Sequence, residues 1–240
     1  MMELLKKLEI PLCQPQRIPI KTLIAQLQLG SADKKILETH IASMKLVSIL
    51  NEQTIRTRPY KDDEYTYQSI YVFFIKLKKD DSITTLSNLI HSAFPEPTIL
   101  LLTCSESEWI SVATKRINKL NRTRTVVDDI TVQKVNTELN EYLSLKNISS
   151  FNLKDYYLRV VQLVYKIGIY NVVHVFPNQD LDYKSIIKEY QHITANIDSL
   201  KKQYKKALTK SSKMSIDDRI YDEEYKLGQI IKQIKGERLL

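Results

Sequence analysis

Carboxylates are the residues in this sequence whose types and spacing come nearest to a catalytic arrangement. Asp62-Asp63-Glu64 lies in a polar stretch, and Asp128-Asp129 lies in an expected strand. Carboxylates that surround a divalent cation can activate water for phosphodiester cleavage. A metal-dependent nuclease with dispersed ligands is therefore one alternative function. Its first suspects are Asp62, Asp63, Asp128, Asp129 and Glu108.

A further acidic group, Asp222-Glu223-Glu224 followed by Tyr225-Lys226, has the residue order of a nuclease motif. All five residues fall on one expected helix, whereas such nucleases gather these groups on neighbouring strands. Acids on a helix surface are usually solvated, so a solvated face is the favoured interpretation.

Other catalytic or cofactor-binding patterns are not found in the sequence. None of the four histidines has a second histidine or a cysteine two to five residues away, and the two cysteines cannot complete a thiolate metal site. The four glycines are isolated, so no glycine-rich phosphate loop is present. The sequence therefore predicts no catalytic residue, no metal and no cofactor, and it favours a non-enzymatic role without settling the question.

Clustered cations form the second chemical pattern, and they predict contact with nucleic acid. One cluster falls on an expected hairpin tip between two strands, and the other ends the first long C-terminal helix. Clustered lysines and arginines neutralise phosphates and release counterions without reading sequence. The alternative is a solvated face with favourable charge at a helix C-terminus. The predicted nucleic-acid-binding residues are Lys115, Arg116, Lys119, Arg122, Arg124, Lys201, Lys202, Lys205 and Lys206.

Residues 183–207 show an unbroken heptad pattern, and with the segment that follows they predict a second domain over residues 181–240. Apolar residues alternate in steps of three and four, and a second periodic segment follows a turn at 210–213. An antiparallel helical hairpin about 40 Å long satisfies both segments. The seam residues, which are predicted to bind a partner, are Tyr183, Ile186, Tyr190, Ile193, Ile197, Leu200 and Tyr204.

Residues 1–180 predict an α+β body that opens with an extended, proline-containing lead-in. Helices are expected from Ile20, from Ser31 to Met44, over 82–94 and over 153–167. The order of these helices and of the strands named next predicts a mostly antiparallel sheet with helices on one face. The expected strands are 46–50, Ile70–Leu77, 98–103, 109–117, Thr125–Val135 and 172–176.

Composition places the chain among soluble globular proteins. The chain is 43% hydrophobic and 27% charged, and its net charge of +8 is compatible with a polyanionic partner. No apolar run is long enough to cross a bilayer, and the first residues lack the apolar stretch of a signal peptide. The sequence therefore predicts a cytoplasmic location.

The layout resembles an uncharacterised prokaryotic family, a domain of unknown function. The segments that carry this resemblance are Ile10-Pro11, 18–21, 50–54, Ile70–Leu77, 82–94, 97–103 and 216–220. The resemblance implies a setting beside helicases and DNA methyltransferases in restriction or phage-defence gene clusters. It implies no reaction.

Three hypotheses follow. The first is a non-catalytic accessory subunit of a bacterial antiviral-defence or DNA-processing assembly. It would bind a larger protein, such as a helicase or another ATPase, and would contact DNA or RNA through its basic patches. The second is the dispersed-ligand nuclease, and the third is a structural homodimer formed by the C-terminal helices.

Overall fold

The computed structural model describes residues 3–26, 29–122, 124–177 and 181–236, and it divides the chain into two units. We call residues 1–167 the body, and the second unit covers residues 168–240. The predicted boundary after residue 180 adjoins residues 178–180, which lie outside the described residues, so it stays a prediction.

The elements of the body are α1 (Glu3–Lys7), β1 (Gln16–Arg17), α2 (Ile20–Gln26), α3 (Ser31–His40), β2 (Ile41–Leu50), α4 (Glu52–Ile55), β3 (Tyr60–Lys61), β4 (Thr66–Tyr67), β5 (Ile70–Leu77), α5 (Ile83–Ala93), β6 (Thr98–Cys104), β7 (Ser107–Ile117), β8 (Thr125–Val135), the 3-10 helix η1 (Thr137–Tyr142) and the larger part of α6 (Leu153–Val173).

A six-stranded sheet in the order β1-β2-β5-β6-β7-β8 forms the centre of the body. Every neighbouring pair is antiparallel except β5 and β6, which run parallel and are joined through α5. A separate two-stranded ribbon joins β3 to β4. The predicted fold class, α+β with a mostly antiparallel sheet, is confirmed.

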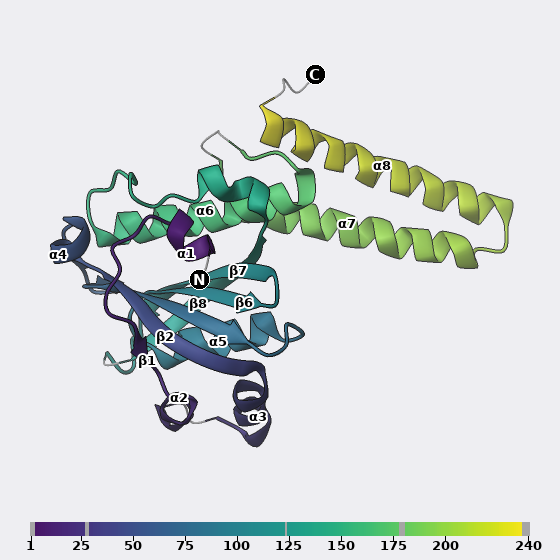
Figure 1. Cartoon of the computed structure of the whole chain (residues 1–240). Helices are drawn as coiled ribbons and strands as arrows, with labels where there is room; N and C mark the ends of the chain where they lie inside the picture. Colours follow the sequence, from purple (N-terminus) through teal and green to yellow (C-terminus); the bar gives the residue numbers. More distant parts are fainter. Residues whose placement is uncertain (1–2, 27–28, 123, 178–180, 237–240) are drawn as a thin grey trace. The chain divides into compact units, whose positions relative to one another are not determined.

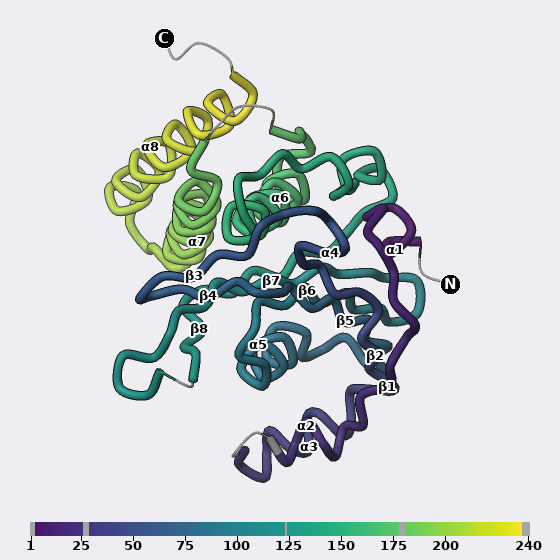
Figure 2. The backbone as a smooth tube through the Cα atoms, turned by 90° about the vertical axis from the view of Figure 1, so that its left-hand side faces the viewer, coloured from purple at the N-terminus to yellow at the C-terminus, as the bar shows by residue number. Residues whose placement is uncertain are grey.

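Helices cover the sheet on both sides (Figure 2), with α5 on one face and α6 on the other. The helix-covered face predicted from the sequence corresponds to the side of α2, α3 and α5. Its core joins Leu23, Leu37 and Leu86 to Phe73 and Ile75 of β5. The strand β5 lies third in the six-stranded order, inside the sheet. The opposite face receives α6 in addition.

Several element boundaries differ from the prediction, and the segment 210–213, expected to be a turn, is helical instead. The lead-in begins with α1, because Leu4 and Leu5 are buried against the body. The helix expected to reach Met44 ends at His40. From Ile41 onward the chain pairs with β5 and forms β2, which therefore begins earlier than expected. Apolar spacing at 37, 41 and 44 suits a helix, but tertiary pairing overrides it.

A strand expected over 172–176 is wrong. The helix α6 continues to Val173, and His174 then adopts a left-handed backbone with a φ of 56° that ends it. Short β-branched runs do not separate a strand from the end of a buried helix by sequence alone.

The second unit contains α7 (Tyr183–Lys206) and α8 (Lys210–Lys235), which pack against each other as the predicted antiparallel hairpin (Figure 1). Asp182 caps α7 by accepting a hydrogen bond from the Ser185 N–H at 3.2 Å, and Thr209 caps α8 through the Ser212 N–H at the same distance. We call α7 and α8 together the hairpin. No helix among the described residues is long and apolar enough to cross a bilayer.

Candidate nucleic-acid interface

The structure does not gather the five carboxylates suspected of holding a metal. Glu108 and Asp129 lie six residue pairs apart along the β7–β8 ladder, about 20 Å at the usual rise of a strand. Asp128 is paired with Arg116 at 2.7 Å. Within the described part of the chain, no three His, Cys, Asp or Glu side chains are placed to hold a metal ion.

Asp62 organises the β3–β4 turn. Its carboxylate accepts hydrogen bonds from the Tyr60 hydroxyl at 2.6 Å and from the backbone N–H groups of Glu64 and Tyr65. The Tyr60 bond, helped by those N–H groups and by Lys154, holds the pKa of Asp62 at about 2. The Lys154 ammonium also lies over the rings of Tyr60 and Tyr65. The Asp62 oxygens are therefore occupied by donors that stabilise a turn.

Lys115, predicted to contact nucleic acid, is buried instead, with 4% of its surface exposed. Its Nζ donates to the backbone carbonyls of Phe94 and Glu96, each at 2.7 Å, and lies 3.5 Å from Thr98 Oγ1. Phe94 is the C-cap residue of α5, so the amine caps the end of that helix. This prediction was therefore wrong, because the side chain points into the body and cannot reach a phosphate.

Lys115 lies at one end of a buried chain of polar side chains that the sequence pattern did not predict. His91 is fully buried, with Nδ1 2.6 Å from Thr98 Oγ1 and Nε2 2.9 Å from Ser111 Oγ. Burial, with the nearby Lys115 charge, lowers the pKa of His91 well below its usual value, so the ring is neutral. The chain ties α5 to β6 and β7. Ser111 and Lys115 stand at alternate positions of one buried strand, with Ala113 between them, so they share one face of that strand. Two polar residues on a buried face are the sequence signal for such a polar chain.

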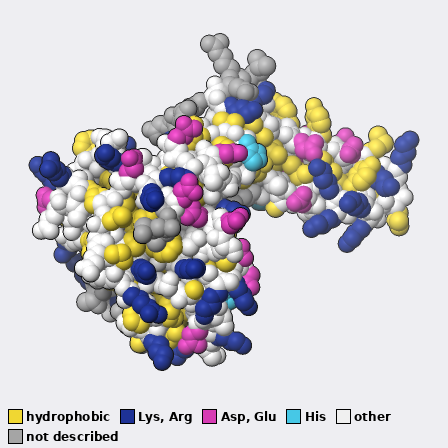
Figure 3. All heavy atoms as spheres, viewed as in Figure 1, with side chains coloured by type: hydrophobic (Ala, Val, Ile, Leu, Met, Phe, Trp, Pro, Cys, Tyr) yellow, Lys and Arg dark blue, Asp and Glu magenta, His cyan; other side chains and the backbone are white. Residues whose placement is uncertain are grey.

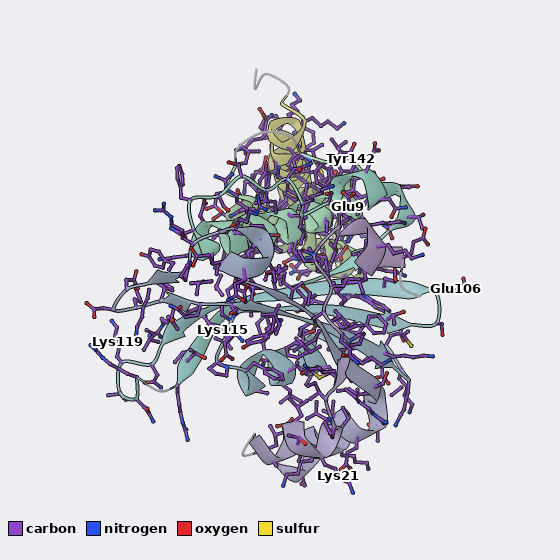
Figure 4. All side chains as sticks on the ribbon, turned by 60° about the vertical axis from the view of Figure 1, so that its left-hand side comes forward. Glu9, Lys21, Glu106, Lys115, Lys119 and Tyr142 are labelled. Atoms are coloured by element: carbon purple, nitrogen blue, oxygen red, sulfur yellow. The ribbon has the colours of Figure 1, made fainter. Side chains whose placement is uncertain are left out.

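Three members of the first basic cluster do project into solvent. Lys119, Arg122 and Arg124 are exposed on the connection between β7 and β8. Figure 4 shows Lys119 on this outlying connection and Lys115 within the body. Arg116 is partly covered and is neutralised by Asp128 across the strand pair. The sequence contains no acid between Trp109 and Val127, but strand pairing supplies one from residue 128.

The second cluster lies at the loop end of the hairpin, where Lys and Arg side chains gather (Figure 3). Lys201, Lys202, Lys205 and Lys206 are all exposed on α7. Lys201 pairs with Glu224 of α8 at 3.1 Å. The other three have no acidic partner among the described residues. They are the least neutralised of the predicted nucleic-acid contacts on α7.

The predicted partner-binding seam is largely used inside the chain. Tyr190 is partly covered and Tyr204 is 36% exposed. The buried members of the seam are Tyr183, Ile186, Ile193, Ile197 and Leu200. These five side chains are buried in this structure, so they offer no open surface to a second protein. Their role as partner contacts stays a prediction.

Comparison with known proteins supports the resemblance seen in the sequence. A search of curated proteins and a search of solved structures each gave no match. A family model described as a domain of unknown function, DUF4391, matches residues 13–227, which cover the sheet and most of the hairpin. The chain therefore belongs to the DUF4391 family.

Proposed function

We propose that this protein is an accessory subunit that binds nucleic acid through the loop end of its hairpin. The observation that carries the proposal is the exposure of Lys202, Lys205 and Lys206 without an acidic partner among the described residues. Such cations attract phosphates strongly, because no internal ion pair has to be broken first.

The start of α8 adds two cations in a position that the helix itself disfavours. Lys210 and Lys213 occupy its first turn, which contains no acidic residue. The N-terminus of a helix carries partial positive charge, so lysines there cost stability, whereas acids there would stabilise the helix. Residues that break a local preference are often retained for function. A phosphate bound at this end would favour both the lysines and the helix terminus.

The loop between the helices brings the two lysine groups together. Only Ala207, Leu208 and Thr209 separate Lys206 from Lys210. A backbone phosphate track therefore meets cations from both helices within a short distance. Such contacts are sequence-independent, so the proposal is for binding to backbone rather than to particular bases.

The β7–β8 connection offers a smaller second contact. Lys119, Arg122 and Arg124 are exposed there, beside Leu120, which is 99% exposed. Within this proposal they add affinity, and the hairpin end supplies most of it, because more lysines gather there.

The test is a binding titration with fluorescently labelled single-stranded DNA, duplex DNA and RNA at a series of salt concentrations. On duplex DNA, each phosphate contact contributes about 0.9 to the slope of log affinity against log salt. The variant Lys202→Gln/Lys205→Gln/Lys206→Gln is expected to bind about tenfold more weakly at low salt and to lower that slope by about two to three units.

The matched control removes three charges elsewhere. Lys34, Lys35 and Lys188 are also exposed, and the variant Lys34→Gln/Lys35→Gln/Lys188→Gln lowers net charge by the same amount. Equal losses in both variants would mean that total charge, rather than the hairpin end, governs binding, and would refute the proposal. So would wild-type protein that binds none of the three probes at low salt.

The wider setting belongs to the same proposal. A larger protein partner, such as a helicase or another ATPase, and a role in bacterial antiviral defence rest on the resemblance stated from the sequence. The nuclease alternative has no comparable support, since its suspects do not come together among the described residues.

A further inference from the structure

The helix α8 carries a second heptad line that the hairpin does not use. Its steps alternate between four and three residues, and at 100° per residue they fall on the side of α8 opposite to its buried line. The buried line consists of Ile220, Ile230 and Ile234, which are buried, together with the partly covered Ile216, Glu223 and Leu227. The outer line is Met214, Asp218, Tyr221, Tyr225, Gly228, Lys232 and Lys235. We call the second set the outer line.

Large side chains of the outer line are unusually open to solvent. Met214 is 61% exposed, Tyr221 is 71% exposed and Tyr225 is 58% exposed. The described residues leave these three side chains largely uncovered, whereas Gly228 and Lys232 farther along the line are partly covered. Aromatic residues and methionine are enriched where proteins meet other proteins.

Gly228 continues the row and has no internal reason to be glycine. A Cβ at this position would find no atom to contact within 4 Å. Glycine within a helix costs about 1 kcal/mol relative to alanine. A flat position beside two exposed tyrosines is instead suited to a second helix that approaches closely.

The charges on the outer line are complementary to one another, although they lie too far apart to pair within one helix. Asp218 precedes Lys232 by about four turns and Lys235 by nearly five. None of the three has an ion-pair partner within the described residues. An antiparallel second copy of α8 would place the acidic half of one helix against the basic half of the other. We propose that the outer line is a homodimer interface, occupied by α8 of a second copy in antiparallel orientation.

Heptad geometry and charge together select one register. In an antiparallel helix pair, an a position of one helix lies opposite a d position of the other. In the favoured register Asp218 lies opposite Lys235 of the second copy, Tyr221 opposite its Lys232 and Tyr225 opposite its Gly228. Each of these contacts occurs twice, because a two-fold axis relates the two copies. The ring of Tyr225 then rests on the flat glycine, and each carboxylate meets an ammonium.

The register shifted by one heptad is disfavoured. It would bring Asp222 close to Asp222 of the second copy and Glu224 close to its Glu224. Like charges that face each other across such a pair are destabilising. In the selected register, Asp222 instead faces Gln229 of the second copy.

The paired stretch would run from residue 218 to residue 235, about 27 Å at 1.5 Å per residue. A single helix pair lies near the low end of specific interfaces, at roughly 1,000 Å² of buried surface. We therefore expect a reversible dimer whose population rises with protein concentration.

Sedimentation velocity on the full chain over a concentration series tests the interface. Asp218→Lys alone and Lys235→Asp alone should each weaken the dimer at least tenfold, because each places like charges opposite one another. The double variant Asp218→Lys/Lys235→Asp exchanges the two charges and should restore it. Glu189→Lys, an equal charge change at an exposed site on α7, should leave the dimer unchanged.

Gly228→Leu supplies an independent readout that misfolding cannot imitate. The substitution fits the isolated helix and should raise its thermal stability, since leucine is a far better helix former than glycine. It should nevertheless weaken the dimer at least tenfold by obstructing Tyr225 of the second copy. Three outcomes would each overturn the proposal: a wild-type chain that stays monomeric at every concentration, a folded double variant that fails to recover, or an unaffected dimer in Gly228→Leu. A monomer would assign the outer line to a different protein.

Discussion

Replacing Tyr157 with alanine is expected to lower the free energy of unfolding of the body by about 3–5 kcal/mol. The ring is fully buried between α6 and the sheet. Its hydroxyl lies 2.8 Å from the Thr98 carbonyl and 2.9 Å from the Ala113 carbonyl, and it accepts from the Ala113 N–H at 3.1 Å. The last registered pair of β6 and β7 is Ile99 with Val112. The tyrosine hydroxyl therefore bonds to Thr98 and Ala113, the residues next to this last pair, in place of a direct hydrogen bond between the two strands.

The two parts of this effect can be separated with Tyr157→Phe. That change keeps the ring but leaves buried backbone groups of Thr98 and Ala113 unsatisfied, so a loss of about 1–3 kcal/mol is expected. Tyr156→Phe is the matched control, because its hydroxyl donates only to the Leu145 carbonyl, at 3.2 Å.

Denaturant unfolding followed by tryptophan fluorescence measures both variants. Trp109 is the only tryptophan in the chain and lies on β7, so the signal reports the body. If Tyr157→Phe were no more destabilising than Tyr156→Phe, the hydroxyl would not be completing the ladder.

The body is expected to become more stable as pH rises from about 7.5 to about 9.5. Burial lowers the pKa of Lys115 to about 7, against the opposing charge of Glu96, while the same group in the unfolded chain titrates near 10.5. Between those two values the unfolded chain binds one more proton than the folded chain. Stability then rises with pH, by at most about 1.4 kcal/mol per pH unit.

The upper limit of this window comes from buried tyrosines. Burial raises the pKa of Tyr67, of Tyr157 and, to about 12, of Tyr156. Groups with raised pKa contribute stability that is present below their unfolded value of 10 and is lost as pH rises further. Their effect therefore begins above the window and has the opposite sign.

Lys115→Met tests the assignment, since it keeps most of the side-chain volume and removes the titrating amine. Its unfolding free energy should be nearly flat between about pH 7.5 and 9.5, whereas Lys119→Met, at an exposed site, should keep the wild-type slope. A slope that persists in Lys115→Met would mean that another group causes it.

Much of the fold follows from local pattern. A run of β-branched and aromatic residues predicts β5, and the step of three and four predicts α7 and its buried residues at Ile193, Ile197 and Leu200. These predictions succeed because the repeat of a helix or strand fixes the direction in which each of its side chains points. The strand expected over 172–176 fails because a short apolar run carries no period of its own.

The candidate site was less predictable, because chemistry depends on neighbours that are distant in sequence. Lys115 and Lys119 stand four residues apart and look alike in the sequence, yet one caps α5 and the other lies in solvent. Arg116 looks unopposed until β8 places Asp128 beside it. The sequence alone allows the five suspected carboxylates to form a metal site, but the register of β7 and β8 separates Glu108 from Asp129.

The sequence by itself determined most of the helices and strands, the hairpin and the presence of clustered cations, because periodicity and composition are properties of neighbouring residues. The tertiary structure alone decided which lysines remain free, which seam is buried and that α8 keeps a second, open line of side chains. Burial and ion pairing are settled by contacts between segments far apart in the chain, and no local pattern contains that information.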